Sequence, residues 1–404
     1  MNASTIIGAV EIGTSKVVVL VGEIVDGREL EIIGLGQASS RGVRKGEIFD
    51  IRAASDCTHA ALLTAEKCAG AEIQGVYLAI TGNHLEGFNN SGVVTVEDAD
   101  NWVRPVDIER AAENARSKAL PQGRLYIHHV RSGYVLDGEP YAEPLDRQGS
   151  QLEAHYWHVH GNERKIADPM HVINGFSLTV EDMIVSSIAS GSMVTLEEEK
   201  RAGVLVLDIG CGTTDYVLYR QGRVARTGVI AVGGDHFTND LSLGLRISYK
   251  DAESLKLRYG KALVDRDDKG QNVMLVGDMR IGDRPIPRMA INKILNARAE
   301  ELFMILQNKL GSLLSAQNLP AGVILTGGGS RLQDLATLGE SILKVPVRTA
   351  QNPDWVSNEQ LRDPEFSTVL GLMHHGLSAK RTHATDGTQA KSRRWISKMT
   401  EIFK

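Results

Sequence analysis

The sequence contains one short turn motif twice, and this repetition restricts the folds that the chain can adopt. Residues 11–15 read EIGTS and residues 208–214 read DIGCGTT, and each stretch lies between two apolar, strand-like runs. A single turn of this kind is more often the polar tip of a β-hairpin. Two copies that lie about 197 residues apart (208 minus 11) instead predict two similar α/β halves that face each other.

The composition is compatible with two such halves. The 404 residues are 42% hydrophobic and 24% charged, which is typical of a soluble globular protein with enough length for two cores. The net charge of -5 argues against general nucleic-acid binding. The three cysteines (Cys57, Cys68 and Cys211) are too scattered for a zinc knuckle, and their odd number fits a disulfide framework poorly, so they favour a reducing cytoplasm. We expect no signal peptide and no transmembrane segment, since no basic stretch precedes an apolar core and the run at 17–21 is too short to span a bilayer.

Hydrophobic periodicity and breaks in composition predict the further organisation of the chain. The expected parts are a first half at 1–83, 164–202 and part of 360–377, an inserted α+β subdomain at 84–163, a second half at 203–359 with a small subdomain at about 235–310, a linker at 378–390 and a last helix at 391–404. Helices are expected at 52–69 (capped by Asp50), 106–119, 180–194, 251–259, 290–314 and 364–376, with a charged connector at 197–201.

The two turns offer a way to hold phosphate groups without a P-loop, since the chain has no GxxxxGK(S/T) motif. Glycines permit positive φ, and successive backbone amides then form an anion-binding nest to which the neighbouring threonine and serine hydroxyls add donors. The acidic residues beside the turns would repel phosphate unless a cation lay between them. Mg²⁺ suits this role because it keeps water molecules that donate to carboxylates. The predicted acceptors of such waters are Glu11, Asp208 and Asp215.

Three further segments fit a nucleotide. Gly233 and Gly234 lie between a strand and a helix, where helix amides can meet a phosphate. Glu253 and Lys256 share one helix face and are predicted to bracket a ribose and an adenine, although a surface ion pair explains them equally well. The three glycines at 327–329 follow a strand and form either a flat shelf for a purine ring or a plain strand-to-helix turn.

These motifs resemble the two phosphate motifs and the adenosine motif of the superfamily that contains actin, heat-shock chaperones and sugar kinases. Within that superfamily, the chain resembles the FtsA family of bacterial cell division proteins over nearly its full length. The resemblance implies a duplicated two-domain α/β fold, actin-like and ribonuclease H-like, whose inserted FtsA-type subdomain serves filament contacts and the recruitment of later division proteins. It rests on residues 11–16, 208–215 and 325–329, and on residues 40–46, 76–82, 252–256 and 259–260.

The resemblance also implies ATP and Mg²⁺ as ligands and a cellular task. Many copies would polymerise on the cytoplasmic face of the bacterial inner membrane at midcell, bind the C-terminal tail of FtsZ and help to assemble the septum machinery. Two residues depart from the superfamily pattern: Glu11 stands where Asp is usual, and Cys211 stands where glycine is usual. The expected ATP-binding residues are Gly13, Thr14, Ser15, Lys16, Gly210, Gly212, Thr213, Thr214, Gly233, Gly234, Glu253, Lys256, Gly327, Gly328 and Gly329.

The same resemblance leaves the catalytic residues unassigned. Actin-like hydrolases usually supply a Gln or Glu near residues 186–191 to orient the attacking water, and here that stretch reads SSIASG. We therefore expect at most a slow ATPase in which nucleotide binding is the functional event. A small-molecule kinase of the same superfamily is the alternative, but it would need an Asp base that no motif identifies. A chaperone ATPase would need a substrate-binding domain after the nucleotide domain.

Residues 391–404 predict a membrane-binding helix. The apolar residues Trp395, Ile396, Met399, Ile402 and Phe403 recur at helical spacing, and five cations against Glu401 give a charge of +4. A basic amphipathic helix that contains a tryptophan suits an anionic membrane surface. The alternative is a terminal helix packed on the protein body. The cations assigned to the membrane contact are Arg393, Arg394 and Lys398.

Two other groups of residues permit weaker predictions. An acidic FtsZ tail is expected to meet Arg288, Lys293 and Arg298, although a solvated helix face explains these cations nearly as well. The histidines His155, His158 and His160 are interpreted as solvated or packed side chains, because only the last two would share a strand face and no nearby cysteine completes a metal site.

Overall fold

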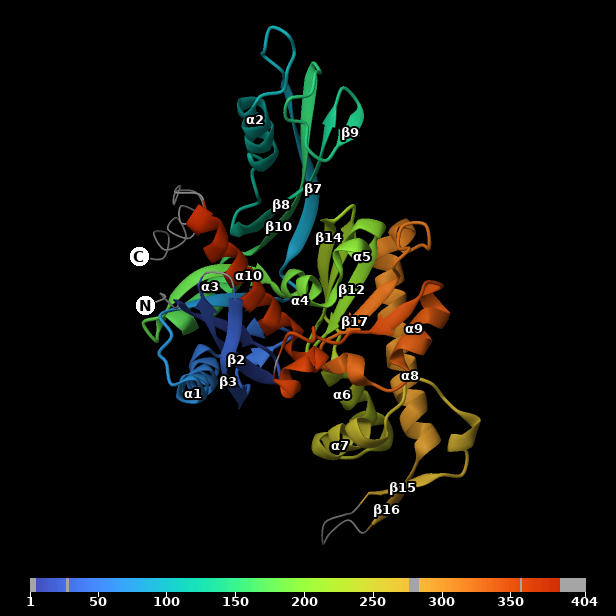
Figure 1. Ribbon diagram of the computed structural model, residues 1–404. Coiled ribbons are helices and arrows are strands. Elements are labelled where there is room, and N and C mark those ends of the chain that lie inside the picture. Colours follow the sequence, from blue (N-terminus) through green and yellow to red (C-terminus); the bar gives the residue numbers. More distant parts are fainter. Residues whose placement is uncertain (1–4, 27–28, 276–282, 357, 386–404) are drawn as a thin grey trace.

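The computed structural model describes residues 5–26, 29–275, 283–356 and 358–385, and two five-stranded sheets form the body of the molecule (Figure 1). The strands of the first sheet are, from edge to edge, β11 (Thr179–Val185), β6 (Gly75–Ile80), β1 (Thr5–Ile12), β2 (Lys16–Val25) and β3 (Glu29–Ser39). Those of the second are β18 (Val347–Thr349), β17 (Val323–Thr326), β12 (Val204–Ile209), β13 (Thr214–Arg220) and β14 (Arg223–Ile230).

The two sheets share one topology. In the first, β1 pairs antiparallel with β2 and parallel with β6, and in the second β12 pairs antiparallel with β13 and parallel with β17. The outer strands follow the same rule, since β3 and β14 are antiparallel to their neighbours while β11 and β18 are parallel to theirs. This equivalence confirms the predicted duplication, and it brings the turn after β1 and the turn after β12 to corresponding places in the two halves.

Helices cover the first sheet and join it to the second. Asp50 caps α1 (Ile51–Ala69) as predicted, because its carboxylate accepts from the amide of Ala53. The helix α4 (Ser186–Val194) contacts α10 (Ser367–Thr385) as well as β12 and β13. Small residues allow this close packing: a Cβ on Gly371 would lie 2.0 Å from the carbonyl oxygen of Ala189. The remaining elements of the first half are β4 (Val43–Arg44), β5 (Glu47–Ile48) and α3 (Glu163–Asn174).

The second half carries a helical extension on the side away from the insertion (Figure 1). Two helices that follow β14 pack against a third, longer helix, and their buried residues form one core with the second sheet. The helices of the second half and of the connector before it are α5 (Glu197–Ala202), α6 (Gly234–Leu245), α7 (Tyr249–Tyr259), α8 (Arg288–Leu310) and α9 (Leu335–Leu343). The strands β15 (Asn272–Leu275) and β16 (Arg284–Pro287) form a small hairpin. Short 3₁₀ turns are η1 (Arg266–Asp268), η2 (Gly311–Leu313), η3 (Gly328–Arg331), η4 (Glu359–Arg362) and η5 (Pro364–Phe366).

A separate sheet and helix form the insertion, which projects from the first half (Figure 1). Its strands follow the order β7 (Glu86–Thr95), β10 (Gln151–Asn162), β8 (Arg124–Leu136) and β9 (Glu139–Tyr141), and α2 (Pro105–Arg116) packs on β7 and β10. The insertion has a small core of its own. It also contacts the second half, because the indole Nε1 of Trp157 donates to the hydroxyl of Thr227 at 3.0 Å and Arg223 donates to the carbonyl of Ala142 at 2.8 Å.

The structure corrects several predicted elements. The expected helix at 180–194 is a strand followed by a helix, because residues 179–185 pair in parallel with β6 and only α4 is helical. The expected connector at 197–201 is the short helix α5, and α3 and α9 were not predicted. The last described helix runs to Thr385 and so enters the expected linker, since Ala379 packs on the core and Lys380 pairs with Glu181. No helix in the described ranges is both long enough and apolar enough to cross a bilayer.

Candidate functional site

A cavity of about 610 Å³ lies between the two halves. Its volume falls within the range of about 300–1,000 Å³ that is usual for small-molecule sites. Both repeated turns line it, together with residues of α7, of η3 and of the segment before α10. The predicted site residues that line the cavity are Glu11, Gly13, Thr14, Ser15, Lys16, Asp208, Gly210, Gly212, Thr213, Asp215, Gly234, Glu253, Lys256, Gly327, Gly328 and Gly329.

Each turn is closed by one backbone hydrogen bond and lines the cavity. Gly13 donates to the carbonyl of Lys16 at 3.0 Å, and Gly210 donates to that of Thr213 at 2.9 Å. Within the described ranges, the structure assigns no hydrogen-bond partner to the backbone amides of residues 14, 15, 211 and 212. Such amides at a cavity wall can bind an anion.

The glycines of the turns serve close approach and not positive φ, which corrects the predicted reason for them. None of Gly13, Gly210 and Gly212 has a positive φ. A Cβ on Gly212 would instead lie 2.5 Å from the hydroxyl of Thr14, so only glycine lets the second turn reach the first. Because neither turn needs positive φ, Cys211 fits without backbone strain, and burial raises the pKa of its thiol to about 11.

Three carboxylates lie behind the turns: Asp208 and Asp215 are buried, and Glu11 is half-buried. Burial, followed by the charge of Asp208, raises the pKa of Glu11 to about 8, and burial likewise raises the pKa of Asp215 to about 7. The pKa of Asp208 is also raised by burial, although the hydroxyl of Thr368 donates to it at 2.8 Å. Asp215 accepts from the hydroxyls of Thr81 and Thr213. These three acids repel one another, and a cation with its water molecules would relieve that repulsion.

The described residues contain no group of three or more acidic, histidine or cysteine side chains arranged to ligate a metal directly. Carboxylates that are not grouped for direct ligation can still accept hydrogen bonds from the water molecules of a hydrated cation.

The start of α6 is used differently from the prediction. The amides of Gly234 and Asp235 donate to the carbonyls of Gly210 and Cys211 at 2.9 and 2.8 Å. They therefore fix the second turn and are not free for a phosphate. The hydroxyl of Thr214 also points away from the cavity, since it is buried and donates to the carbonyl of Val232 at 2.8 Å. Gly233 is the N-cap of α6 and, like Thr214, is not among the cavity-lining residues.

Glu253 and Lys256 form the ion pair that the alternative interpretation expected, at 2.8 Å, and both also line the cavity. The ammonium of Lys256 donates to the carbonyl of Gly234 at 3.0 Å and to the hydroxyl of Thr238 at 2.7 Å. Lys256 therefore ties α7 to the start of α6, while its neighbour Glu253 stays 36% exposed.

The three glycines after β17 have different roles. Gly327 has a φ of 79°, which favours glycine, and a Cβ there would lie 2.3 Å from Asp208. A Cβ on Gly329 would lie 2.5 Å from the side chain of Ile209. At Gly328, in contrast, the nearest atom is 3.8 Å away in Glu365, so a side chain would stand in the cavity. Only Gly328 therefore offers an open surface of backbone.

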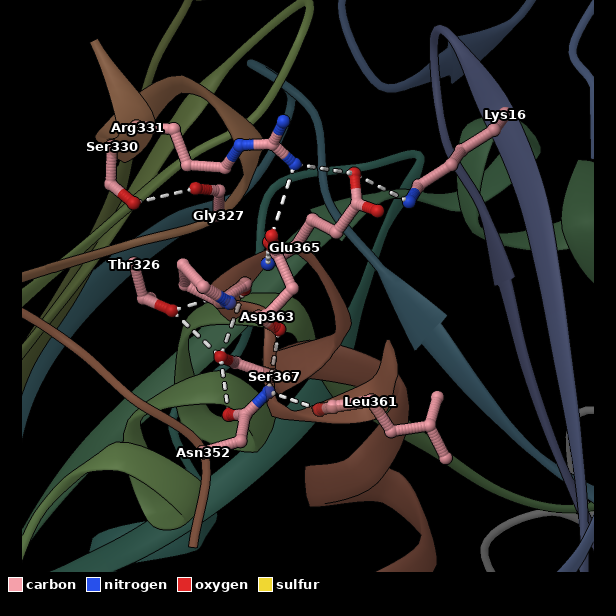
Figure 2. A network of polar contacts seen from close by, with 11 residues as sticks. Lys16, Thr326, Gly327, Ser330, Arg331, Asn352, Leu361, Asp363, Glu365 and Ser367 are labelled. Atoms are coloured by element: carbon pink, nitrogen blue, oxygen red, sulfur yellow. Dashed lines mark hydrogen bonds and ion pairs between the residues drawn. The ribbon is translucent and has the colours of Figure 1, made fainter. Parts of the chain in front are cut away.

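A polar network ties the segment before α10 to these glycines (Figure 2). The amide of Gly327 and the hydroxyl of Thr326 both donate to the carbonyl of Pro364, and the amide group of Asn352 donates to the carbonyls of Leu361 and Asp363. The hydroxyl of Ser367 donates to the carbonyl of Pro364 and to Oδ1 of Asn352, and it shares a hydrogen bond with the hydroxyl of Thr326. This network fixes the segment that leads from the second half back to the first.

Sequence reasoning missed several residues of the cavity wall, among them Gly46, Thr81, Arg331, Glu365 and Thr368. One signal was present for Thr81, because a polar residue that follows a buried strand such as β6 often faces a site. Glu365 and Thr368 carried no local signal. They reach the cavity only because α10 packs on the first sheet.

The other predicted sites lie away from the cavity or outside the described residues. On α8, Arg298 forms two hydrogen bonds with Asp240, and Arg288 pairs with Asp268, whereas Lys293 is exposed. The membrane segment at 391–404 and the end of the expected linker, 386–390, lie outside the described residues.

The three histidines of β10 differ in their surroundings. His155 pairs with Glu153 at 3.3 Å, while the rings of His158 and His160 are buried. His158 exchanges a hydrogen bond with His129, and His160 accepts one from Arg124. All three have neighbours within the insertion, although the buried Nε2 atoms of His155 and His158 have no hydrogen-bond partner among the described residues.

The sequence of this chain matches known protein families and relatives. A family model described as "Cell division protein FtsA" matches residues 205–371, and one described as "SHS2 domain inserted in FTSA" matches residues 82–160. The chain is 34% identical over 383 residues to cell division protein FtsA of Pseudomonas aeruginosa, which covers 93% of this chain and 90% of that protein. It is 33% identical over 408 residues to FtsA of Neisseria meningitidis, covering 96% and 97%.

Solved structures share the fold at lower identity. The PilM-PilN type IV pilus biogenesis complex aligns with a TM-score of 0.65 and 20% identity over 92% of this chain and 98% of that one. MreB5 of Spiroplasma citri bound to ADP aligns with a TM-score of 0.57 and 14% identity over 94% and 99%. These similarities, with the matched inserted domain, confirm the predicted actin-like fold with an FtsA-type insertion.

Proposed function

This chain belongs to the FtsA family of cell division proteins, and from that membership we propose that it binds ATP with Mg²⁺, polymerises, and anchors FtsZ to the cytoplasmic face of the bacterial inner membrane at midcell. The observation that carries the proposal is the cavity between the duplicated halves, which two equivalent turns line with backbone amides that have no partner among the described residues.

The wall of the cavity supports ATP as the ligand. The amides of residues 14, 15, 211 and 212 suit phosphate oxygens, and Lys16 adds a cation. The open backbone at Gly328 suits the flat face of a purine, and Glu253 lies within reach of a ribose from the same wall. The fold neighbour MreB5 of Spiroplasma citri was solved with ADP, which supports a nucleotide here by analogy.

The carboxylates support Mg²⁺ as the companion of the phosphates. Glu11, Asp208 and Asp215 would hold it through its water molecules, and the ion would offset the repulsion between these acids and the phosphate chain. We expect turnover to be slow, because the stretch 186–191 contributes only Ser186 to the cavity wall and no acid or amide.

Membrane attachment is proposed for residues 391–404. Burial of the apolar face formed by Trp395, Ile396, Met399, Ile402 and Phe403 adds to the attraction of Arg393, Arg394 and Lys398 for anionic lipid. A single helix of this kind binds reversibly. A filament presents many such helices at once, so attachment becomes firm after polymerisation.

Two protein contacts complete the proposal. The FtsZ tail is assigned to the exposed side of α8, where Lys293 is the cation most available to an acidic peptide because Arg288 and Arg298 already pair with acids of this chain. The insertion is assigned to contacts with later division proteins and with other copies in a filament.

Sedimentation with lipid vesicles tests the proposal most directly. The full chain should pellet with anionic vesicles, more strongly with ATP and Mg²⁺ than without, and should carry FtsZ into the pellet. A chain that stays in the supernatant under all conditions would overturn the anchoring function. A coupled assay with common sugars and acetate as acceptors tests the kinase alternative, and rapid phosphorylation of any of them would favour it.

A further inference from the structure

One carboxylate in the cavity wall belongs to neither turn and lies between cations of the two halves (Figure 2). Oε2 of Glu365 is 3.0 Å from Nζ of Lys16, at the start of β2, and 3.8 Å from Nη1 of Arg331, at the end of η3. Arg331 is held in turn by Asp363 at 3.1 Å. Glu365 therefore bridges the first half to the second at the wall of the cavity.

Lys16 is enclosed by this arrangement. Its Nζ lies 4.4 Å from the centroid of the Phe366 ring in addition to its contact with Glu365, and its side chain is 25% exposed. The position of Glu365 also matters for a ligand. Its side chain lies 3.8 Å from the point that a Cβ on Gly328 would occupy. Glu365 thus stands between the open backbone of Gly328 and the first turn.

A nucleotide that rests on Gly328 and extends its phosphates toward the turns would meet this carboxylate on the way. The phosphate chain and Glu365 are both anions, and both would seek the ammonium of Lys16. The phosphate chain and Glu365 cannot both form a full-strength ion pair with Lys16 at the same time.

On the basis of the nucleotide site proposed above, we propose that Glu365 is a specificity-determining residue that competes with nucleotide phosphate for Lys16. Without nucleotide, the carboxylate holds Lys16. When phosphate arrives, Lys16 turns to it and Glu365 is left to Arg331, which already lies within ion-pair distance. Glu365 thereby weakens the binding of phosphorylated ligands while leaving a neutral nucleoside unaffected.

The substitution Glu365→Gln tests this because it removes the charge and keeps the shape. Affinities for ATP, ADP and adenosine are measured by competition titration, each in Mg²⁺ and in EDTA. We expect ATP and ADP to bind roughly three- to tenfold more tightly in both conditions, as the loss of one half-buried competing ion pair implies, and adenosine to bind unchanged. Asp354→Asn is the matched control, since it makes the same change of charge on the same connecting segment at a fully exposed position, and it should change nothing.

A second variant checks that the effect runs through Lys16. In a Lys16→Met background the gain from Glu365→Gln should disappear, because the contested cation is gone. Weaker ATP binding by Glu365→Gln in Mg²⁺ alone would instead make Glu365 a ligand of the ion and overturn the inference. An unchanged affinity for ATP and ADP, or an equal gain for adenosine, would overturn it too. These outcomes require that the unsubstituted protein binds nucleotide. If it binds neither ATP nor ADP, the proposed function itself is wrong.

Discussion

The hydroxyl of Thr368, the second residue of α10, donates a hydrogen bond of 2.8 Å to Oδ2 of Asp208 at the end of β12. The two residues are 160 positions apart in the sequence. This bond joins a helix of the first half to a buried carboxylate of the second, at the edge of the cavity.

Thr368→Val should therefore destabilise the fold and weaken ATP binding together. Leaving a buried carboxylate without this donor costs about 1–3 kcal/mol, which urea denaturation would measure. The affinity for ATP in Mg²⁺ should fall as well, because Asp208 becomes harder to ionise. Thr64→Val on α1 is the control: its hydroxyl donates to a backbone carbonyl four residues earlier and to no carboxylate, and the site is exposed, so stability should change by less than about 0.5 kcal/mol. Equal losses in the two variants would contradict the assigned role.

Neighbouring glycines should respond differently to a side chain. Gly328→Val adds atoms where the nearest neighbour is 3.8 Å away, so the protein should fold normally and bind ATP at least tenfold more weakly. Gly329→Ala places a Cβ 2.5 Å from Ile209 and should cost about 1–3 kcal/mol of stability through overpacking. Thermal unfolding and a fluorescence titration separate the two effects. If Gly328→Val binds ATP like the parent, the purine does not lie on this backbone.

Single-turnover hydrolysis of ATP should be far slower than the 10 s⁻¹ or so that is typical of enzymes. The helix that begins at Ser186 presents no acid or amide to the cavity, so nothing there orients a water molecule. Quench-flow measurement with excess protein gives the rate directly. A value near 10 s⁻¹ would reject the view that binding is the functional event.

Mild acid should destabilise the junction between the insertion and the first half. Burial lowers the pKa of His84 to about 4 from its usual 6.5, and its Nδ1 accepts from the amide of Asn162 at 3.2 Å. Between these two pH values His84 is protonated in the unfolded chain but not in the folded one. The free energy of unfolding therefore falls as pH falls from about 6.5 toward 4, by up to about 3 kcal/mol. His84→Gln should show a smaller loss of melting temperature between pH 7.5 and pH 5 than the parent. An identical loss would mean that other groups control the acid response.

Trp395→Glu should abolish vesicle binding while ATP binding stays intact, because it puts a charge on the apolar face of the C-terminal segment. Replacing Arg393 and Arg394 with Ala should weaken binding mainly to anionic vesicles, by about 1 kcal/mol for each charge, and added salt should narrow the difference. Co-sedimentation measures both. If Trp395→Glu still pellets like the parent, the segment is not the anchor.

The sequence predicts most of what is local in this molecule. Asp50 and the apolar spacing of α1 identify that helix, and the repeated turns identify the two halves and most of the cavity wall. The helix predicted at 180–194 is wrong because the apolar pattern of these residues suits a buried strand as well as a helix. Only the pairing with β6 decides between the two. Glu365 and Thr368 could not be predicted as residues of the cavity wall, for another reason. Their roles arise from tertiary contacts that join segments more than 150 residues apart, as the Thr368–Asp208 bond does.

The attachments of the insertion have a mechanical consequence. Its chain enters near His84 and leaves at Asn162, whose amide donates to His84. The hydrogen bonds from Trp157 to Thr227 and from Arg223 to Ala142 join the insertion to the second half. A rotation of one half against the other must therefore break the bond between Trp157 and Thr227 or swing the whole insertion. Because α2 and β9 lie at the end of the insertion away from the two five-stranded sheets (Figure 1), a small rotation of the halves would become a large displacement at their surface. A rotation that accompanied ligand binding in the cavity would therefore move a partner bound to α2 or β9, although that partner does not contact the cavity.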